Sequence, residues 1–174
     1  KLIGAGLQQV GLSRNQIADR RTLIRRATFD LHGMPPTPQE VKEFESDSAN
    51  DAWPRLIDRL LSSPRYGERW ARHWLDVARY SDTKGYVRLK DNPLYPAAWT
   101  YRDYVIHSFN EDLPYNQFVL EQLAADQLSA MPPKTGNLVT DRAPQSLAAM
   151  GFLTLGQRFI NSPNDIIDDR IDVV

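Results

Sequence analysis

Apolar side chains recur at helical spacing along most of this chain. Between residues 53 and 61 they follow the i, i+3, i+4, i+7, i+8 rule without a fault, at Trp53, Leu56, Ile57, Leu60 and Leu61. Similar patterns predict further helices at residues 19–31, 99–109, 112–128, 144–155 and 162–174. No stretch shows the sustained alternation of a β-strand. The sequence therefore predicts an all-α fold, an irregular orthogonal or bundle-like array of about seven or eight helices with long ordered loops.

Turn-forming and capping residues mark the limits of these helices. Gly33 is placed to end the helix predicted at residues 19–31, because glycine readily adopts the left-handed conformation of a helix stop. Thr37 and Glu40 have the spacing of a capping box that begins the next helix. Two stretches containing proline and glycine, residues 81–97 and 129–143, are predicted to be loops, the first ordered by its aromatic residues and the second a loose surface loop.

One predicted helix, which Ser62-Ser63-Pro64 starts and which includes residues 68–80, has two contrasting sides. Its apolar side carries two of the four tryptophans, Trp70 and Trp74, and a large aromatic side chain hides roughly 150–250 Å² when buried. We therefore expect the other segments to pack around this helix. A polar row lies opposite, at helical offsets 0, 4, 7 and 11, formed by Arg69, His73, Asp76 and Tyr80.

This polar row is the first candidate for chemistry. His73 and Asp76 are three positions apart, so the carboxylate can hold the imidazole in one tautomer, as a general base requires. Tyr80 is the third candidate catalytic residue. Three arginines are candidates for binding a carboxylate or sulfate group: Arg69, Arg72 and Arg79. The commoner role of such a mixed-charge row is to pair with neighbouring helices, and that alternative stays open.

A second candidate region lies just after this helix, where functional loops often occur. Asp82 and Tyr86 can form a ligand rim there together with Arg102 and Asp103 of the next predicted helix. A loop that is pinned for structural reasons alone would use the same residue types.

The case for a metal site is weaker. Clustered carboxylates can hold Ca²⁺ or Mg²⁺, and four aspartates near the C-terminus are weak candidates: Asp165, Asp168, Asp169 and Asp172. However, a straight helix rarely wraps a cation, and acidic residues near a helix start are favoured by the helix dipole anyway. The three histidines lack the HxxxH and HExxH spacings of zinc sites. We therefore expect no cofactor within this chain.

Composition narrows the classes further. The 21 basic and 22 acidic residues give a net charge of −1, so no overall field favours nucleic acid or an anionic membrane surface. The chain has no cysteine, which excludes disulfides, thiolate metal ligands and covalent haem attachment within it. No apolar run approaches the ~18 residues of a membrane span. Residues 1–174 are predicted to form a single helical domain, a fragment of a larger multi-domain protein that is truncated within its last helix.

Several long motifs resemble one known family. They are LIRRATFDLHGMPPTPQEV at 23–41, RLLSSPRYGERWARHWLDVARYSDTKGY at 59–86, WTYRDYVIHSFNEDLPYNQFVLEQLAADQL at 99–128, MGFLTLG at 150–156 and DDRIDVV at 168–174. Together they are similar to the planctomycete cytochrome-associated domain of the second type, "PSCyt two", a family without an assigned function. The similarity covers nearly the whole chain from residue 19 onward.

The resemblance implies a setting for the chain. Members are large, exported, multi-domain proteins of Planctomycetes and related bacteria, often with a c-type cytochrome domain upstream, so it implies a periplasmic or extracellular location and other domains of the same polypeptide as partners, a cytochrome c domain among them. In the family, the segment equivalent to 168–174 runs on to a Cys-x-x-Cys-His haem-attachment sequence. Haem c would then belong to the full-length protein, and the resemblance carries over no catalytic residue.

These observations predict a helical module that scaffolds or docks redox domains, or forms one wall of a haem or ligand site completed by downstream sequence. Two alternatives come from other classes. One is a hydrolase-like enzyme domain that acts on extracellular polymers, with His73, Asp76 and Tyr80 in its site. The other is a carbohydrate-binding module that uses exposed tryptophan and tyrosine side chains.

Overall fold

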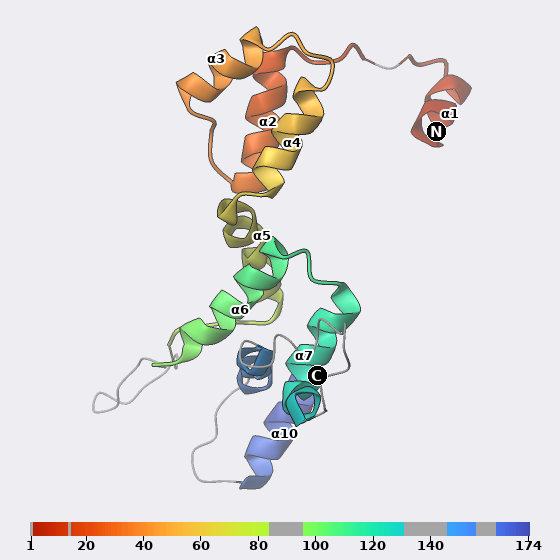
Figure 1. Cartoon of the computed structure of the whole chain (residues 1–174). Helices are drawn as coiled ribbons and strands as arrows, with labels where there is room; N and C mark the ends of the chain where they lie inside the picture. Colours follow the sequence, from red (N-terminus) through yellow and green to blue (C-terminus); the bar gives the residue numbers. More distant parts are fainter. Residues whose placement is uncertain (1, 14, 84–95, 131–145, 156–162) are drawn as a thin grey trace. The chain divides into compact units, whose positions relative to one another are not determined.

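Helices account for all the regular structure in the described part of the chain (Figure 1). The computed structural model describes residues 2–13, 15–83, 96–130, 146–155 and 163–174. Within these residues there are nine helical elements and no β-strand, which confirms the predicted all-α class. Contacts between Cα atoms divide the chain into two compact units, Lys1–Arg59 and Leu60–Val174. The prediction of a single, truncated domain stays a prediction.

Unit 1 contains α1 (Leu2–Gln9), α2 (Arg20–His32), α3 (Pro38–Ser46) and most of α4 (Ala52–Leu61). Asp19 begins α2 by accepting a hydrogen bond from the Thr22 backbone N–H, and Gly33 ends it with φ 72°, as its sequence predicts. The predicted capping box at the start of α3 is also confirmed. The Thr37 side chain accepts from the Glu40 N–H, and the Glu40 carboxylate accepts from the Thr37 N–H.

A buried phenylalanine anchors the end of α3 in unit 1. The Phe44 ring lies 6.3 Å from that of Trp53, and the Arg20 guanidinium covers it at 5.1 Å from the ring centroid. Arg20 also donates to the backbone carbonyls of Phe44 and Asp47. A cation at the carbonyl end of a helix satisfies acceptors that the helix itself leaves unpaired. One arginine therefore joins α2 to the C-terminal end of α3.

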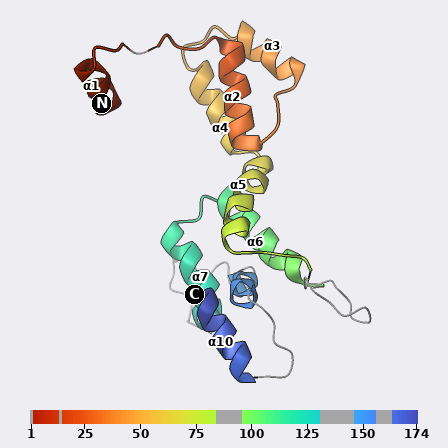
Figure 2. The ribbon, with the colours of Figure 1, turned by 180° about the vertical axis from the view of Figure 1, so that it is seen from behind.

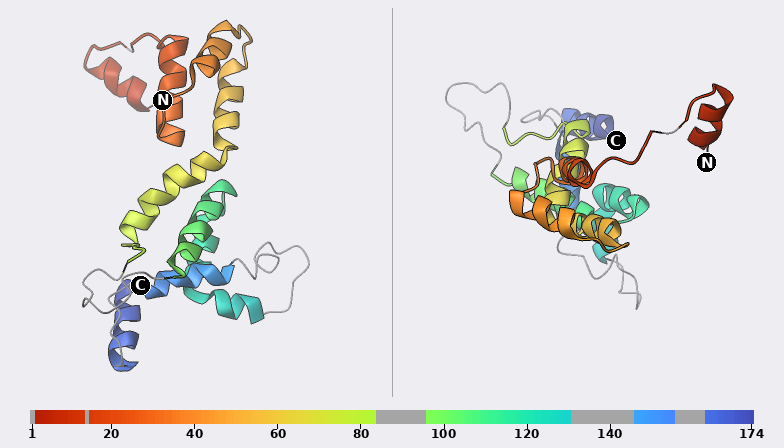
Figure 3. Two further views of the ribbon diagram at one scale, coloured as in Figure 1. Left: turned by 90° about the vertical axis from the view of Figure 1, so that its left-hand side faces the viewer. Right: turned by 90° about the horizontal axis from the view of Figure 1, so that it is seen from above.

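Unit 2 begins with a close crossing of two helices, α5 (Pro64–Val77) and α6 (Ala98–Asn110), which lie side by side in Figures 2 and 3. The Gly67 N–H donates to Asn110 Oδ1 over 2.7 Å. A Cβ atom at residue 67 would lie 2.4 Å from the carbonyl oxygen of Ile106, so the crossing requires glycine there.

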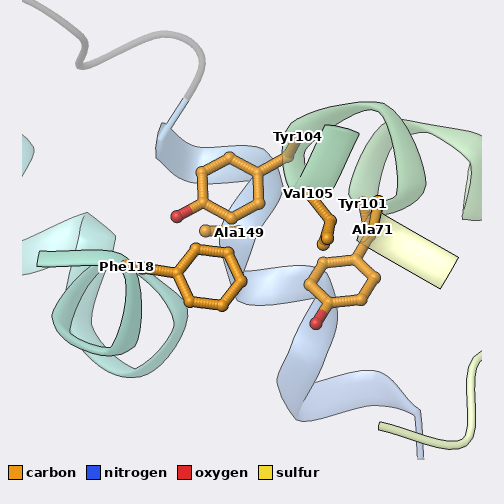
Figure 4. Close-up of a cluster of buried hydrophobic side chains, with 6 residues drawn as sticks. All are labelled: Ala71, Tyr101, Tyr104, Val105, Phe118 and Ala149. Carbon is orange, nitrogen blue, oxygen red and sulfur yellow. The ribbon is translucent and has the colours of Figure 1, made fainter. Parts of the chain in front are cut away.

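The core of unit 2 is aromatic (Figure 4). It is formed by six buried residues: Ala71, Tyr101, Tyr104, Val105, Phe118 and Ala149. They come from α5, α6, α7 (Tyr115–Ala130) and the 3₁₀ helix η1 (Leu147–Thr154). Trp74 of α5 completes the cluster, with its ring edge-on to Phe118 at 4.9 Å. Of the two tryptophans expected to organise the fold, Trp74 thus reaches the core, whereas the ring contacts of Trp70 are with its α5 neighbours Tyr66 and His73.

Three elements differ from the sequence predictions. Helix α5 (Pro64–Val77) begins where Ser63 and Pro64 predict, with the Ser63 side chain accepting from the Arg65 N–H, but it ends at Val77 rather than at residue 80. The predicted helix at 144–155 is a 3₁₀ helix in its described part, and α7 has a kink at Ala124. Most of the two predicted loops, 81–97 and 129–143, lies outside the described residues.

Candidate functional site

Helix α5 presents the first part of the predicted polar row to solvent. His73 and Asp76 are both exposed, and among the described residues no hydrogen bond joins them. Asp76 Oδ2 lies instead 3.8 Å from Nε of Arg72, and both of these side chains are more than 70% exposed. The His73 ring rests against the Trp70 indole, with ring centroids 5.3 Å apart. The helix therefore places His73 and Asp76 on one surface without a hydrogen bond between them, and their catalytic role stays a prediction.

The polar row does not continue to Tyr80 as a helical row, because α5 ends at Val77. Arg79 follows in the left-handed conformation with φ 58°, an uncommon value for a residue other than glycine, and its side chain is exposed. Arg69 lies within the helix and is half-buried. Its Nε is buried without a hydrogen-bond partner in the described part of the chain. The arginine candidates thus lie in different environments.

Beyond the turn, Tyr80 points back to the aromatic core. Its ring centroid lies 6.2 Å from that of Tyr101, and its hydroxyl donates to Asp82 Oδ1. Burial, together with the hydrogen bond to Asp82 and the negative charge there, raises the pKa of Tyr80 above its ordinary value of 10. The phenol therefore keeps its proton, and its hydrogen bond to Asp82, to a higher pH than an ordinary tyrosine does.

Tyr80 belongs to a polar cluster with Asp82, Arg102 and Asp103, which joins the residues that follow α5 to α6. A guanidinium nitrogen of Arg102 lies 3.9 Å from Asp82 Oδ2, and another lies 3.3 Å from Asp103 Oδ1. The three charged side chains are between 40% and 55% exposed, so this is a partly desolvated surface cluster. The structure thus brings together four of the candidates. Tyr86, the remaining rim candidate, lies outside the described residues.

The four C-terminal aspartates lie on α10 (Pro163–Val173). Asp165, Asp168 and Asp172 are exposed, and the side chain of Asp169 is outside what the structure describes. Across the described residues, no three histidine, cysteine, aspartate or glutamate side chains are grouped so that they could hold a metal ion. These weak metal candidates have no further support from the fold and stay predictions.

The sequence patterns did not predict two buried polar networks. In the first, the Tyr101 hydroxyl donates to Gln122 Oε1 over 2.7 Å and accepts from Trp74 Nε1 over 2.9 Å. The Gln122 side chain in turn donates to the backbone carbonyl of Phe118. Tyr101 and Gln122 are both almost fully buried. The network therefore ties α5, α6 and α7 together inside the aromatic core.

The second network is centred on a carboxylate. Glu121 is completely buried, and it accepts hydrogen bonds from the Tyr104 hydroxyl and from the Gln117 amide, each over 3.0 Å. Within the described residues no ion pair is formed by Glu121. The sequence signal that could have predicted this network is the helical spacing of its residues in α7. Gln117, Glu121 and Gln122 lie on one helix face. The same face carries the buried residues Phe118 and Ala125.

Taken together, these features define an all-helical module in which buried Tyr101, Tyr104, Glu121 and Gln122 join helices and in which the described charged candidates other than Arg69 lie at the surface. No helix in the described residues has the length and apolar character needed to cross a membrane. The chain belongs to the PSCyt2 family, described as "Protein of unknown function (DUF1549)", whose model matches residues 1–174. This match confirms the family inferred from the sequence motifs. No curated protein and no solved structure matches the chain.

Proposed function

We propose that this chain is a non-catalytic helical module of an exported, c-type-cytochrome-associated protein. In this role it scaffolds or docks the redox domains of the same polypeptide, or it forms one wall of a haem or ligand site that downstream sequence completes. Membership of the PSCyt2 family supports the proposal, since the motifs resemble proteins in which a Cys-x-x-Cys-His segment follows this region.

The observation that carries the proposal is the contrast between buried and exposed polar groups. A general base needs an oriented partner, yet His73 and Asp76 are exposed and are not hydrogen-bonded to each other in the described structure. Four buried polar side chains of the core are paired with each other: Tyr101 with Gln122, and Tyr104 with Glu121. Such bonds between helices fix a rigid framework, which is what a scaffold requires.

The test uses a longer polypeptide that contains the downstream Cys-x-x-Cys-His segment, expressed with haem-maturation machinery. We expect a Soret band from covalently attached haem. If the helical module supports the haem site, a Glu121→Ala change in its core lowers the haem content, whereas Asp76→Asn at the surface leaves it unchanged.

Two results would contradict the proposal. One is a well-folded longer polypeptide that never incorporates haem. The other is turnover of an extracellular polymer that is lost in His73→Ala while the melting temperature stays the same, because this would identify an enzyme domain.

A further inference from the structure

An exposed indole stands at the start of α6. Trp99 is 52% exposed, and its Nε1 donates to the carbonyl oxygen of Pro96 over 3.1 Å. Because this bond satisfies the only polar group of the side chain, the exposed ring can contribute to binding chiefly through its apolar face. The same bond limits rotation of the indole, so a ligand that stacked on it would lose little side-chain entropy.

Charged groups flank this indole on the same side of the helix. Residues three and four positions apart on a helix are neighbours, with Cβ atoms about 5–6 Å apart, so Arg102 and Asp103 both lie beside Trp99. Arg102 is held by Asp103 at 3.3 Å and reaches Asp82 at 3.9 Å. Figures 1 and 2 show the segment that follows α5 running to this end of α6. The surface thus combines an apolar ring with fixed donors and acceptors.

The chemistry of this surface selects among ligands. Two carboxylates and one guanidinium give a local charge of −1, which disfavours anions. A cation would have to compete with Arg102, which already pairs with both acids. A pyranose sugar has an apolar C–H face for the indole, and its hydroxyl groups both donate and accept hydrogen bonds. Asp82 and Asp103 can accept from such hydroxyl groups, while the Arg102 guanidinium donates to them.

From this arrangement we infer that Trp99, Arg102, Asp103 and Asp82 form a binding site for a neutral pyranose polysaccharide. The indole stacks on a sugar ring, and the ion-paired cluster binds the hydroxyl groups at the edge of that ring. This function goes beyond scaffolding, and it would attach the module to a neutral glycan whether or not haem is present.

The test is affinity electrophoresis of the 174-residue chain in gels that contain neutral polysaccharides with glucose, mannose or xylose backbones, with alginate as the polyanionic comparison. We expect retardation by at least one neutral polymer and none by alginate. Trp99→Ala should weaken binding about tenfold or more, and Trp99→Phe, which keeps an apolar ring, should retain part of it. Asp103→Asn tests the hydroxyl contacts and should weaken binding severalfold.

Tyr115→Ala is the matched control, because Tyr115 is 71% exposed at the first residue of α7 and has no part in the proposed site. It should bind as the wild type does. Circular dichroism establishes that each variant is folded, and if Trp99→Ala is not, Trp99→Phe and Asp103→Asn decide the question. The inference is overturned if no neutral polymer retards the wild type, if only alginate does, or if folded variants at residues 99 and 103 bind like the wild type.

Discussion

The inner and outer sides of the α5–α6 pair use polar groups in opposite ways. On the inner side, Tyr101 and Tyr104 of α6 are buried, and each is hydrogen-bonded to a buried side chain of α7, Gln122 and Glu121 respectively. On the outer side, Arg72 and Asp76 form a long, solvated pair within one helix. A buried group that loses its partner carries the full cost of desolvation, whereas a solvated pair exchanges its partner for water. Substitutions should therefore have large effects inside and small effects outside.

The largest effect is expected at the helix crossing itself. Gly67→Ala would place a Cβ atom 2.4 Å from the Ile106 carbonyl oxygen and 2.6 Å from Asn110. Because a backbone atom cannot move aside on its own, α5 and α6 must separate, and we expect a loss of about 3 kcal/mol in the free energy of unfolding. Urea denaturation followed by tryptophan fluorescence measures it.

Gly6→Ala provides the control for this change. A Cβ atom at residue 6, within α1, meets no other atom within 4 Å, so the same substitution there should be neutral or slightly stabilising. Equal effects at residues 6 and 67 would show that the crossing is not close-packed.

The next effect concerns the buried carboxylate. Glu121→Ala removes the buried carboxylate that accepts from the Tyr104 hydroxyl and the Gln117 amide and also creates a cavity, so we expect a loss of about 2–3 kcal/mol. Glu45→Ala is the exposed comparison, because its ion pair with Arg21 is solvated and should be worth less than about 1 kcal/mol. Similar losses in the two variants would contradict the difference between interior and surface.

A third prediction uses alkaline pH. Burial raises the pKa of Tyr101 above its ordinary value of 10, so the unfolded chain ionises this phenol at a pH where the folded chain does not. Stability that is fully present below pH 10 should therefore be lost as the pH rises beyond it. Tyr101→Phe should cost about 1–2 kcal/mol at neutral pH and should reduce this alkaline loss.

The measurement is urea denaturation on either side of pH 10, with tyrosinate absorbance recorded in parallel. Tyr80, whose pKa is also raised, should account for part of the pH dependence that remains in Tyr101→Phe. A pH dependence that is the same in both proteins would remove Tyr101 as its source.

Local sequence signals predicted much of the fold, because they depend only on neighbouring residues. The left-handed stop at Gly33 and the capping box of Thr37 are interactions within a few positions. By contrast, the sequence pattern does not reveal how Gly151 meets the core. A Cβ atom at residue 151 would lie 2.7 Å from Tyr101 Cβ, a contact across 50 positions, and the surrounding segment is 3₁₀ rather than α-helical.

For the candidate site, too, sequence patterns predict what depends on neighbouring residues but not the contacts between distant ones. Helical spacing put His73 and Asp76 opposite the apolar side of their helix, and the structure shows both side chains exposed. Asp82, Arg102 and Asp103 were candidates because functional loops often follow a helix, and the structure brings these three together. Helical spacing did not predict the hydrogen bond between Glu121 and Tyr104, because spacing along one helix does not show which face of another helix packs against it. Buried polar pairing is a property of packing.

A smaller effect is expected in unit 1, where the polar contacts are local. The Thr37 N–H and Arg59 hold the pKa of Glu40 at about 2, below its ordinary 4.5, so this stabilisation is present above pH 4.5 and is lost as the pH falls towards 2. Thr37→Ala should cost about 1 kcal/mol. Hydrogen exchange in α3 measures this loss, and in Glu40→Gln the acid dependence due to residue 40 should disappear.

The smallest effect is expected for the exposed polar residues of α5, His73 and Asp76. A large effect there would contradict the difference between buried and exposed polar groups. Asp76 is one residue from the end of α5, where a negative charge opposes the helix dipole, and its pair with Arg72 is long and exposed. These terms nearly cancel, so Asp76→Asn should change the free energy of unfolding by less than about 0.5 kcal/mol. His73→Ala should behave similarly, with the small loss of its contact with Trp70. Thermal melts at low and high salt check both variants. If either one lost more than about 2 kcal/mol, the row would have to be bound to another part of the chain.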